Sequence, residues 1–237
     1  MTPATPEIIA RNLDRVRARM LVAANHAGRD PSTVRLLAVS KAQPVEALVA
    51  ARAAGQNEFG ENYVQEALAK LEGPRPLSGV IWHFIGTLQA NKTRLVTENF
   101  DWVHTVDRQK IAQRLNDQRP TALPPLNVCI EVNLGGEASK SGIAPADLAS
   151  LADFVAGLPR LRLRGLMALP VVAADPTEQR QPFRELRQLL DELNRQGHVL
   201  DTLSMGTSAD FEAAIREGAT LVRLGTVIFG TRSATRS

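Results

Sequence analysis

The stretch LLAVSKAQP, residues 36–44, contains the first unit of a repeating pattern that decides the fold. Residues Leu36 to Val39 are apolar, which indicates a short buried strand. Lys41 follows where that strand stops, and Pro44 then opens a run of helical periodicity. A lysine at a strand end usually extends its amine into solvent. In a cleft, a lowered pKa instead makes it a Schiff-base amine, and the rest of the chain must decide between the two.

Eight strand-like runs, separated by helical ones, recur along the chain. Because a parallel strand needs a crossover helix before its neighbour, this alternation predicts a parallel sheet. Eight units favour a closed (β/α)8 barrel of the TIM type, with an open doubly wound sheet as the alternative. We expect strands at residues 34–40, 57–60, 80–85, 102–106, 126–133, 163–169, 202–205 and 220–225.

The two ends of the chain add to this prediction. Residues 6–26 carry apolar side chains at helical spacing, which predicts an extra N-terminal helix. Only a short tail follows the eighth strand, so we expect the N-terminal helix to take the outer position of the missing eighth helix. No linker divides the chain, which is expected to form a single barrel domain over residues 1–237. Residues 176–182, PTEQRQP, are expected to form a mobile surface loop.

Composition narrows the possible functions. The net charge is only +3 and aromatic residues make up 4% of the chain, which does not suit a nucleic-acid-binding surface. No apolar run approaches the ~20 residues needed to span a bilayer, and the N-terminus lacks a signal-peptide pattern. Cys129, the single cysteine, is expected to be a buried small hydrophobe, and no metal site is expected. We therefore expect a cytoplasmic protein with no nucleic-acid or membrane partner.

In such barrels, chemistry gathers at the carboxyl ends of the strands. Individually, the residues there have ordinary alternatives: Asn62 could cap a helix, and His83 and His104 could be core histidines. Glu131 shares a strand face with Cys129, so it would need a partner if it faced the barrel interior. The residues at the expected strand ends are Lys41, Glu61, Asn62, His83, Gly86, His104, Asn133, Met167, Ser204, Met205, Gly206, Arg223, Gly225 and Thr226.

The strongest local signal is MGTSADFEAAI, residues 205–215. Thr207 and Asp210 fit the capping box that opens a helix, where free N–H groups attract anions. Residues 224–226, LGT, end the eighth strand, and the loops after strands seven and eight often bind phosphate in these barrels. Both stretches therefore indicate one anion pocket. Ordinary helix capping with a tight turn is the alternative.

Barrel closure then gives Lys41 a candidate role. Strands one and eight are neighbours in a closed barrel, so Lys41 lies within one small molecule's length of the anion pocket. A ligand with a phosphate at one end and an aldehyde at the other fits both groups, and pyridoxal 5′-phosphate (PLP) is such a ligand. The nearby Arg223 would favour the neutral, reactive form of the lysine.

At this point the motifs resemble a known family. The chain is similar to the pyridoxal phosphate homeostasis proteins, which are related to the N-terminal barrel of bacterial alanine racemases. The resemblance implies a monomeric (β/α)8 barrel of the alanine racemase N-terminal domain type that holds PLP as a Schiff base. The motifs that carry it are LLAVSK (36–41), FGENYVQEA (59–67), WHFIGTLQANK (82–92), LSMGTSADFEAAI (203–215) and VRLGTVIFGTR (222–232).

The resemblance also implies a set of cofactor-binding residues. They are Lys41, Asn62, His83, Met205, Ser208, Arg223, Gly225 and Thr226. Among them, Ser208, Gly225 and Thr226 would hold the phosphate, and Arg223 would approach the pyridine nitrogen. Family members are regarded as PLP carriers without an established reaction, with PLP-dependent apoenzymes as candidate recipients.

The chain departs from the family pattern at three positions. Thr207 and Ala209 replace the usual Met and Asp, and Glu131 replaces a usual glutamine. The alternative function is a PLP-dependent amino-acid racemase, which needs a base on each face of the substrate. In racemases the second base is a tyrosine from a C-terminal domain that we expect this chain to lack, and Tyr63 is its single tyrosine. A phosphosugar enzyme is a third, weaker possibility. We expect a PLP carrier without robust catalysis.

Overall fold

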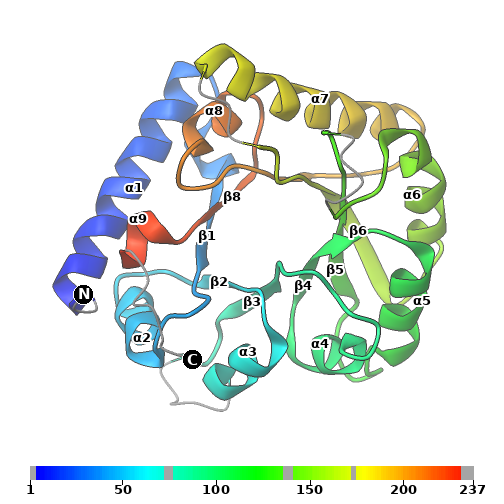
Figure 1. The fold of residues 1–237 in the computed structure, drawn as a ribbon, viewed down its shortest axis with the longest axis horizontal. Coiled ribbons are helices and arrows are strands. Elements are labelled where there is room, and N and C mark those ends of the chain that lie inside the picture. The colour runs from blue at the N-terminus through cyan, green and yellow to red at the C-terminus, as the bar shows by residue number, and fades with distance from the viewer. Residues whose placement is uncertain (1–3, 72–76, 136–140, 172–174, 231–237) are drawn as a thin grey trace.

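The computed structural model describes residues 4–71, 77–135, 141–171 and 175–230. In this part of the chain eight parallel strands form a closed barrel, in which each strand pairs with the next and β8 pairs with β1 (Figure 1). This confirms the predicted (β/α)8 barrel over the open sheet. The strands are β1 (Arg35–Val39), β2 (Glu58–Glu61), β3 (Ile81–Phe84), β4 (Trp102–Val106), β5 (Leu126–Glu131), β6 (Leu161–Met167), β7 (Thr202–Ser204) and β8 (Leu221–Leu224).

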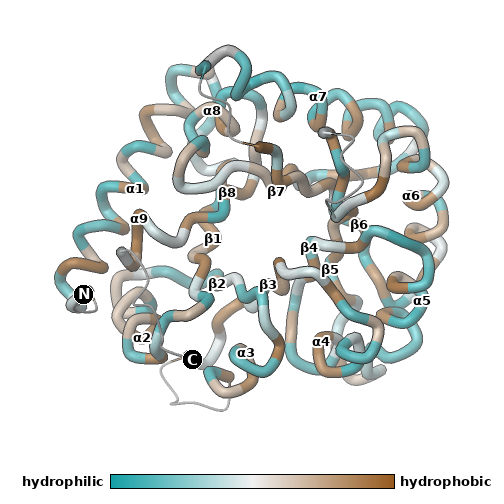
Figure 2. The backbone as a smooth tube through the Cα atoms, viewed as in Figure 1, coloured by the Kyte–Doolittle hydropathy of each residue, from teal (hydrophilic) through white to brown (hydrophobic). Residues whose placement is uncertain are grey.

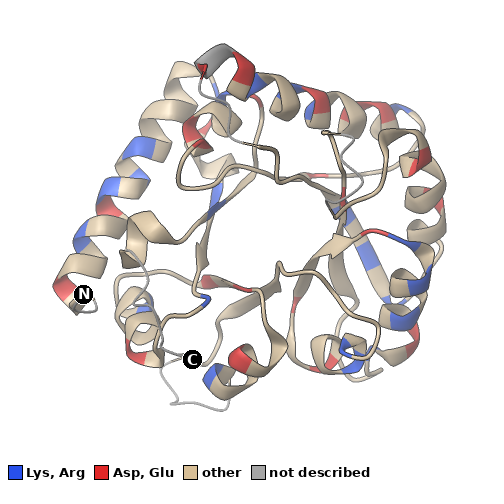
Figure 3. Ribbon diagram, in the orientation of Figure 1, with Lys and Arg blue, Asp and Glu red and all other residues tan. Residues whose placement is uncertain are grey.

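Helices form a layer around this barrel. Figure 2 shows their apolar residues mostly toward the strands, and Figure 3 shows most charged residues on the outer helices. Within the described residues, no helix has both the length and the apolar character needed to cross a membrane. The helices are α1 (Pro6–His26), α2 (Val45–Ala53), α3 (Val64–Leu71), α4 (Thr93–Asn99), α5 (Gln109–Gln118), α6 (Leu148–Ala156), α7 (Pro176–Arg195), α8 (Phe211–Arg216) and α9 (Thr226–Phe229).

The extra N-terminal helix α1 takes the predicted outer position. It packs against α2 on one side and against α8 and α9 on the other. Thr5 caps its start by accepting a hydrogen bond from the N–H of Ile8. Ile9, Leu13 and Val16 are buried on its inner face. The helix therefore closes the outer layer where α9, a single turn, leaves it thin.

The register of β1 against β8 positions the site. Leu37 lies opposite Arg223, and Ala38 lies opposite Leu224. The chain leaving β1 toward Lys41 and the chain leaving β8 toward Gly225 therefore emerge side by side. At Gly225, a Cβ atom would come 3.1 Å from the carbonyl oxygen of Val39, so glycine permits this close approach.

The prediction of a surface loop at residues 176–182 is wrong, because these residues form the first turns of α7. A proline costs nothing at the first helical position, where its missing N–H would have no partner, and Pro176 occupies that position. The Asp175 carboxylate accepts a hydrogen bond from the N–H of Glu178 and caps the new helix. Pro182 lies inside the helix, which sequence reasoning took as a loop signal.

Two local predictions also need correction. The helix expected to open at Thr207 begins at Phe211, because Asp210 turns back and its carboxylate accepts hydrogen bonds from the Thr207 N–H and hydroxyl. The fifth and sixth strands end two residues earlier than expected, at Glu131 and Met167, and the first, third, seventh and eighth each end one residue earlier. Cys129 is buried as predicted, and burial raises the pKa of its thiol to about 12.

Candidate functional site

Two adjoining cavities open at the carboxyl ends of the strands. The smaller has a volume of about 300 Å³ and is lined by groups from the loops after β1, β7 and β8. The structure thus brings together the lysine and the expected anion-binding groups. Six of the eight predicted site residues line this cavity: Lys41, Asn62, Ser208, Arg223, Gly225 and Thr226.

The chemistry of the smaller cavity suits an anion. Its lining includes two cationic side chains, Lys41 and Arg223, and no carboxylate from the described residues. The hydroxyls of Ser208 and Thr226 supply hydrogen-bond donors beside the backbone of Gly225. A phosphate is favoured by this balance of charge and donors.

The loop that carries Lys41 is fixed from behind by a buried charged cluster. Lys70 of α3 donates hydrogen bonds to the carbonyl oxygen of Ser40 at 2.8 Å and to the carboxylates of Glu61 and Glu66, each at 2.7 Å. Glu66 in turn accepts the N–H of Ala42 at 2.5 Å. Lys41 is therefore flanked on both sides by backbone groups that Lys70 and Glu66 hold.

The two residues flanking Lys41 show how tightly the loop is held. The Ser40 hydroxyl donates to Glu61 at 2.6 Å, and Ala42 has a φ of +58°, a left-handed conformation that few non-glycine residues adopt. Burial raises the pKa of Glu61, and the Lys70 ammonium partly offsets that effect. Sequence reasoning missed Lys70, although its spacing from Val64 and Ala67 places it on the buried face of α3.

Arg223 lines both cavities and is anchored by backbone and side-chain acceptors. One terminal nitrogen donates to the carbonyl oxygen of Ser204 at 2.5 Å and to its hydroxyl at 2.8 Å, and the other donates to the carbonyl oxygen of Ala168 at 2.9 Å. Burial lowers the pKa of Arg223 to about 10, so the guanidinium stays charged at neutral pH.

A chain of buried polar groups runs from Arg223 back through the barrel. The Ser204 hydroxyl contacts His104 Nδ1 at 2.7 Å, and His104 Nε2 contacts His83 Nδ1 at 2.9 Å. His83 Nε2 lies 3.2 Å from the Glu58 carboxylate. Burial lowers the pKa of both histidines, that of His104 well below its usual value, so both are neutral near pH 7.

Two predicted site residues therefore do not line either cavity. His83 is fully buried and reaches Arg223 only through His104 and Ser204. Met205 is buried in the core just beyond β7, where its N–H donates to the carbonyl oxygen of Leu221. Tyr63 is 65% exposed and is likewise absent from both linings.

Asn62 stands at the wall that the two cavities share. Its side-chain oxygen Oδ1 is buried and has no hydrogen-bond donor among the described residues. A buried acceptor left without a donor is costly, so this atom suits a ligand that carries a hydroxyl or an N–H. PLP carries a ring hydroxyl that would donate a hydrogen bond to this oxygen, so Asn62 also fits PLP.

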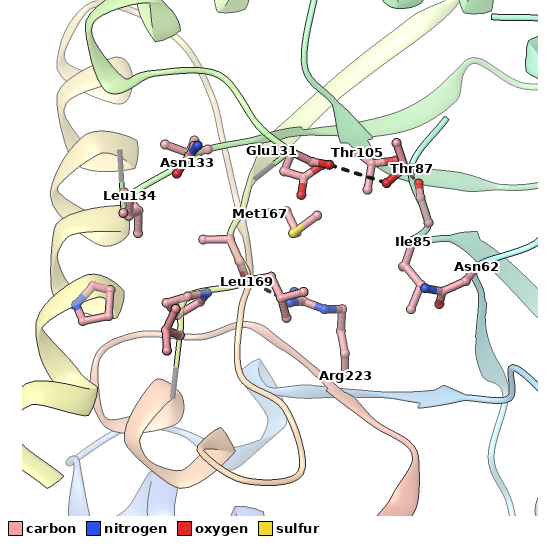
Figure 4. Close-up of a pocket in the computed structure, with 18 of the residues that line it drawn as sticks. Asn62, Ile85, Thr87, Thr105, Glu131, Asn133, Leu134, Met167, Leu169 and Arg223 are labelled. Atoms are coloured by element: carbon pink, nitrogen blue, oxygen red, sulfur yellow. Dashed lines mark hydrogen bonds between the residues drawn. The ribbon is translucent and has the colours of Figure 1, made fainter. Parts of the chain in front are cut away.

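The larger cavity has a volume of about 560 Å³ and lies toward β3, β5 and β6 (Figure 4). Glu131, predicted as a possible charge near the barrel mouth, lines it. Burial, and to a smaller extent the Asp107 carboxylate, raise the pKa of Glu131 to about 7, although Arg223 partly opposes them. Among the described residues, no group of three or more metal-ligating side chains gathers at this end or elsewhere.

Comparison with known proteins defines the class. The family model for the alanine racemase N-terminal domain matches residues 11–233. The chain therefore belongs to the alanine racemase N-terminal domain family. This family membership agrees with the closed barrel that the structure shows.

Closer relatives define the branch within that class. The chain is 59% identical to the pyridoxal phosphate homeostasis protein of Pseudomonas aeruginosa, over 94% of this chain and 96% of that protein. It is 53% identical to the Escherichia coli protein of the same name, over 94% and 97% of the two chains. At this identity and coverage, the chain belongs to the pyridoxal phosphate homeostasis protein family.

A solved structure shows the same architecture. PipY of Synechococcus elongatus, described as having PLP bound, matches with a TM-score of 0.83 and 37% identity, over 94% of this chain and all of that one. The barrel architecture thus recurs in a solved structure that is described as having PLP bound.

Proposed function

We propose that this chain binds PLP and acts as a carrier in PLP homeostasis, with Lys41 as the point of covalent attachment. The observation that carries the proposal is the smaller cavity, which places the Lys41 amine and the hydroxyls of Ser208 and Thr226 in one lining. The names of the curated relatives and the PLP-bound PipY structure support it. Bound PLP would supply an aldehyde that condenses with amines and a ring that withdraws electrons.

Each residue of the cavity has a proposed role. Lys41 would bond to the aldehyde carbon, while Ser208, Gly225 and Thr226 would hold the phosphate. Asn62 would accept the hydrogen bond of the ring hydroxyl, which gives its buried oxygen a donor. His83 and Met205 would affect the cofactor only through the residues that line the cavity, since neither lines it itself.

Arg223 supports the carrier reading over catalysis. An arginine can only donate, so beside the pyridine nitrogen it would meet the unprotonated form and leave the ring a weak electron sink. Racemisation also needs a second base, and Tyr63, which is 65% exposed, lines neither cavity. The arrangement favours holding PLP over turning over amino acids.

The proposed covalent bond between PLP and Lys41 can be tested by reducing it to a stable product. Protein incubated with PLP should absorb visible light, and borohydride should fix the cofactor to the peptide that contains Lys41, as read by mass spectrometry. Lys41→Ala should lose the trapped product but keep weak binding through the phosphate, and Lys92→Ala should behave as wild type. A label on Lys70 or Lys92 would refute the assignment.

The absence of robust catalysis needs its own test. The PLP-loaded protein is incubated with L-alanine in deuterated water, and Cα exchange and the D-isomer are followed. We expect neither at ordinary enzymatic rates of ~1 per second or faster. Formation of D-alanine at such rates, lost in Lys41→Ala, would establish a racemase instead.

The carrier role extends to partners. We propose a cytoplasmic monomer that passes PLP to PLP-dependent apoenzymes. Light scattering should give a mass near the 25.7 kDa of one chain. Activation of an apoenzyme by loaded protein should be faster than activation by the PLP that the protein releases through a dialysis membrane. Equal rates would mean that transfer goes through free solution.

A further inference from the structure

Beyond the wall that it shares with the smaller cavity, the larger cavity has no role in the cofactor contacts proposed above. It shares Asn62, Ile85, Leu169 and Arg223 with the smaller cavity, so a ligand in one would touch a ligand in the other. Its volume of about 560 Å³ exceeds that of its neighbour. The shared wall makes it a second compartment of the same site.

A buried carboxyl dominates this compartment. Glu131 is 8% exposed at the end of β5 and lines the cavity, which it faces together with Arg223 from β8 (Figure 4). Burial and the Asp107 carboxylate raise its pKa, and the Arg223 guanidinium opposes them. A carboxyl buried in this way is stabilised by a ligand that brings positive charge or an N–H donor.

The other groups in the cavity do not suit an anion. Glu178 of α7 adds a second carboxylate to the lining. The terminal nitrogens of Arg223 already donate to Ser204 and Ala168. The rest of the wall combines apolar side chains such as Met167 and Val171 with threonine hydroxyls. A short aliphatic chain with a cationic end matches this wall.

We propose that the larger cavity binds a small aliphatic primary amine, whose ammonium group is held by the Glu131 carboxylate. The inference rests on the proposed function, because primary amines are the ligands that react with an aldehyde held in the adjoining cavity. Glu131 would also accept the proton that the ammonium must lose: R–NH3⁺ and the carboxylate become R–NH2 and the carboxylic acid. The neutral amine then has its lone pair available at the shared wall.

The test uses the cofactor-free protein and a series of four-carbon probes. Calorimetry at pH 8.5 should detect n-butylamine and 1,4-diaminobutane, but neither n-butanol nor butyrate. Glu131→Gln keeps the shape of the side chain and removes its charge, and should weaken amine binding by ~10-fold or more. Glu46→Gln removes an exposed carboxylate on α2 and should change nothing.

The pH dependence provides a second readout. With the pKa of Glu131 at about 7, lowering the pH to 5.5 should weaken n-butylamine binding by ~30-fold, because most of the carboxyl is then protonated. Asp107 and Arg223 also act on Glu131, and Glu178 lines the same cavity, so the pH series is repeated on Glu131→Gln. That variant should lack the pH dependence.

The outcomes separate this inference from the proposed function. Equal binding of n-butanol and n-butylamine, or equal amine affinity in wild type and Glu131→Gln, would overturn the amine site. PLP binding is titrated on the same samples, and its presence alongside such a result leaves the carrier function intact. Failure of the wild type to bind PLP would overturn the carrier function itself. The wild-type probe series decides the question even if the variant does not fold.

Discussion

Ser208 and Thr226 are two hydroxyl residues from different loops that line one cavity. If they hold the phosphate, Ser208→Ala and Thr226→Ala should each weaken PLP binding by ~1–3 kcal/mol, the usual cost of deleting a hydrogen bond to a charged group. Fluorescence or absorbance titration measures the change. The affinity for unphosphorylated pyridoxal should hardly change. Equal losses of affinity for both ligands would indicate damage to the fold.

Ala42 carries strain that a glycine would relieve. Its φ of +58° costs an L-residue roughly 1–2 kcal/mol, whereas glycine adopts it freely but loses more chain entropy on folding. Ala42→Gly should therefore raise the free energy of unfolding by ~0.5–1 kcal/mol in urea denaturation. The same change at Ala50, in the middle of α2, should lower it. A loss of stability at both positions would contradict the strain.

Sequence reasoning identified residues at strand ends better than it identified their surroundings. Lys41, Ser208 and Thr226 follow directly from strand order, because neighbouring carboxyl ends must meet. For His83 and Met205, the strand end alone does not tell whether a side chain lines a cavity or lies in the packed interior, and both lie in the interior. Whether such a side chain reaches the cavity depends on the stagger of the strands in the barrel, which cannot be read from the sequence.

Helix α3 is tied to β1 and β2 through a single buried lysine. Lys70→Met would leave Glu61 buried without its cation, and breaking such a pair costs ~3–5 kcal/mol. Urea denaturation should show this loss, and Lys110→Met, an exposed change on α5, should stay near wild type. Adding Glu61→Gln to Lys70→Met should recover part of the stability. No recovery would mean that lost packing of the lysine stem, not the charge, dominates.

At the level of elements, periodicity was a better guide than composition. The amphipathic pattern predicted α1 with the bounds that the structure has, from Pro6 to His26. The prediction of a loop at residues 176–182 was wrong, because it gave two prolines more weight than the helical pattern that surrounds them. Helical position decides what a proline costs, and only the capping contact of Asp175 reveals that position. Lys70 was missed for a similar reason, since its burial depends on partners from three elements.

The stability of the whole barrel should depend on its neutral histidines. The folded chain lowers the pKa of His83 and His104, so below ~6.5 an unfolded histidine binds a proton that the folded one does not. Acid therefore favours unfolding, by up to ~1.4 kcal/mol per pH unit for each histidine. Glu131, with its pKa raised to about 7, opposes this, because the folded state binds its proton first.

A difference measurement isolates the histidine contribution. The free energy of unfolding of wild type should exceed that of His104→Gln by less as the pH falls from 7 to 5. Wild type loses stability because its unfolded His104 binds a proton, and the variant lacks this loss. The effect of Glu131 is the same in both proteins and cancels. Asn25→Gln, an exposed change of a non-titrating residue near the end of α1, should show a constant difference from wild type. A constant difference for His104→Gln would mean that folding does not lower the pKa of His104.

Barrel closure between β1 and β8 also imposes an order in time. The ribosome releases α1 and β1 first, yet the strand that pairs with one edge of β1 and the helices that cover much of α1 come from the last part of the chain. Ile9, Leu13 and Val16 therefore remain incompletely covered during most of synthesis, and an incomplete chain presents both an open strand edge and an apolar helix face. The nascent protein is most prone to aggregate just before it is complete.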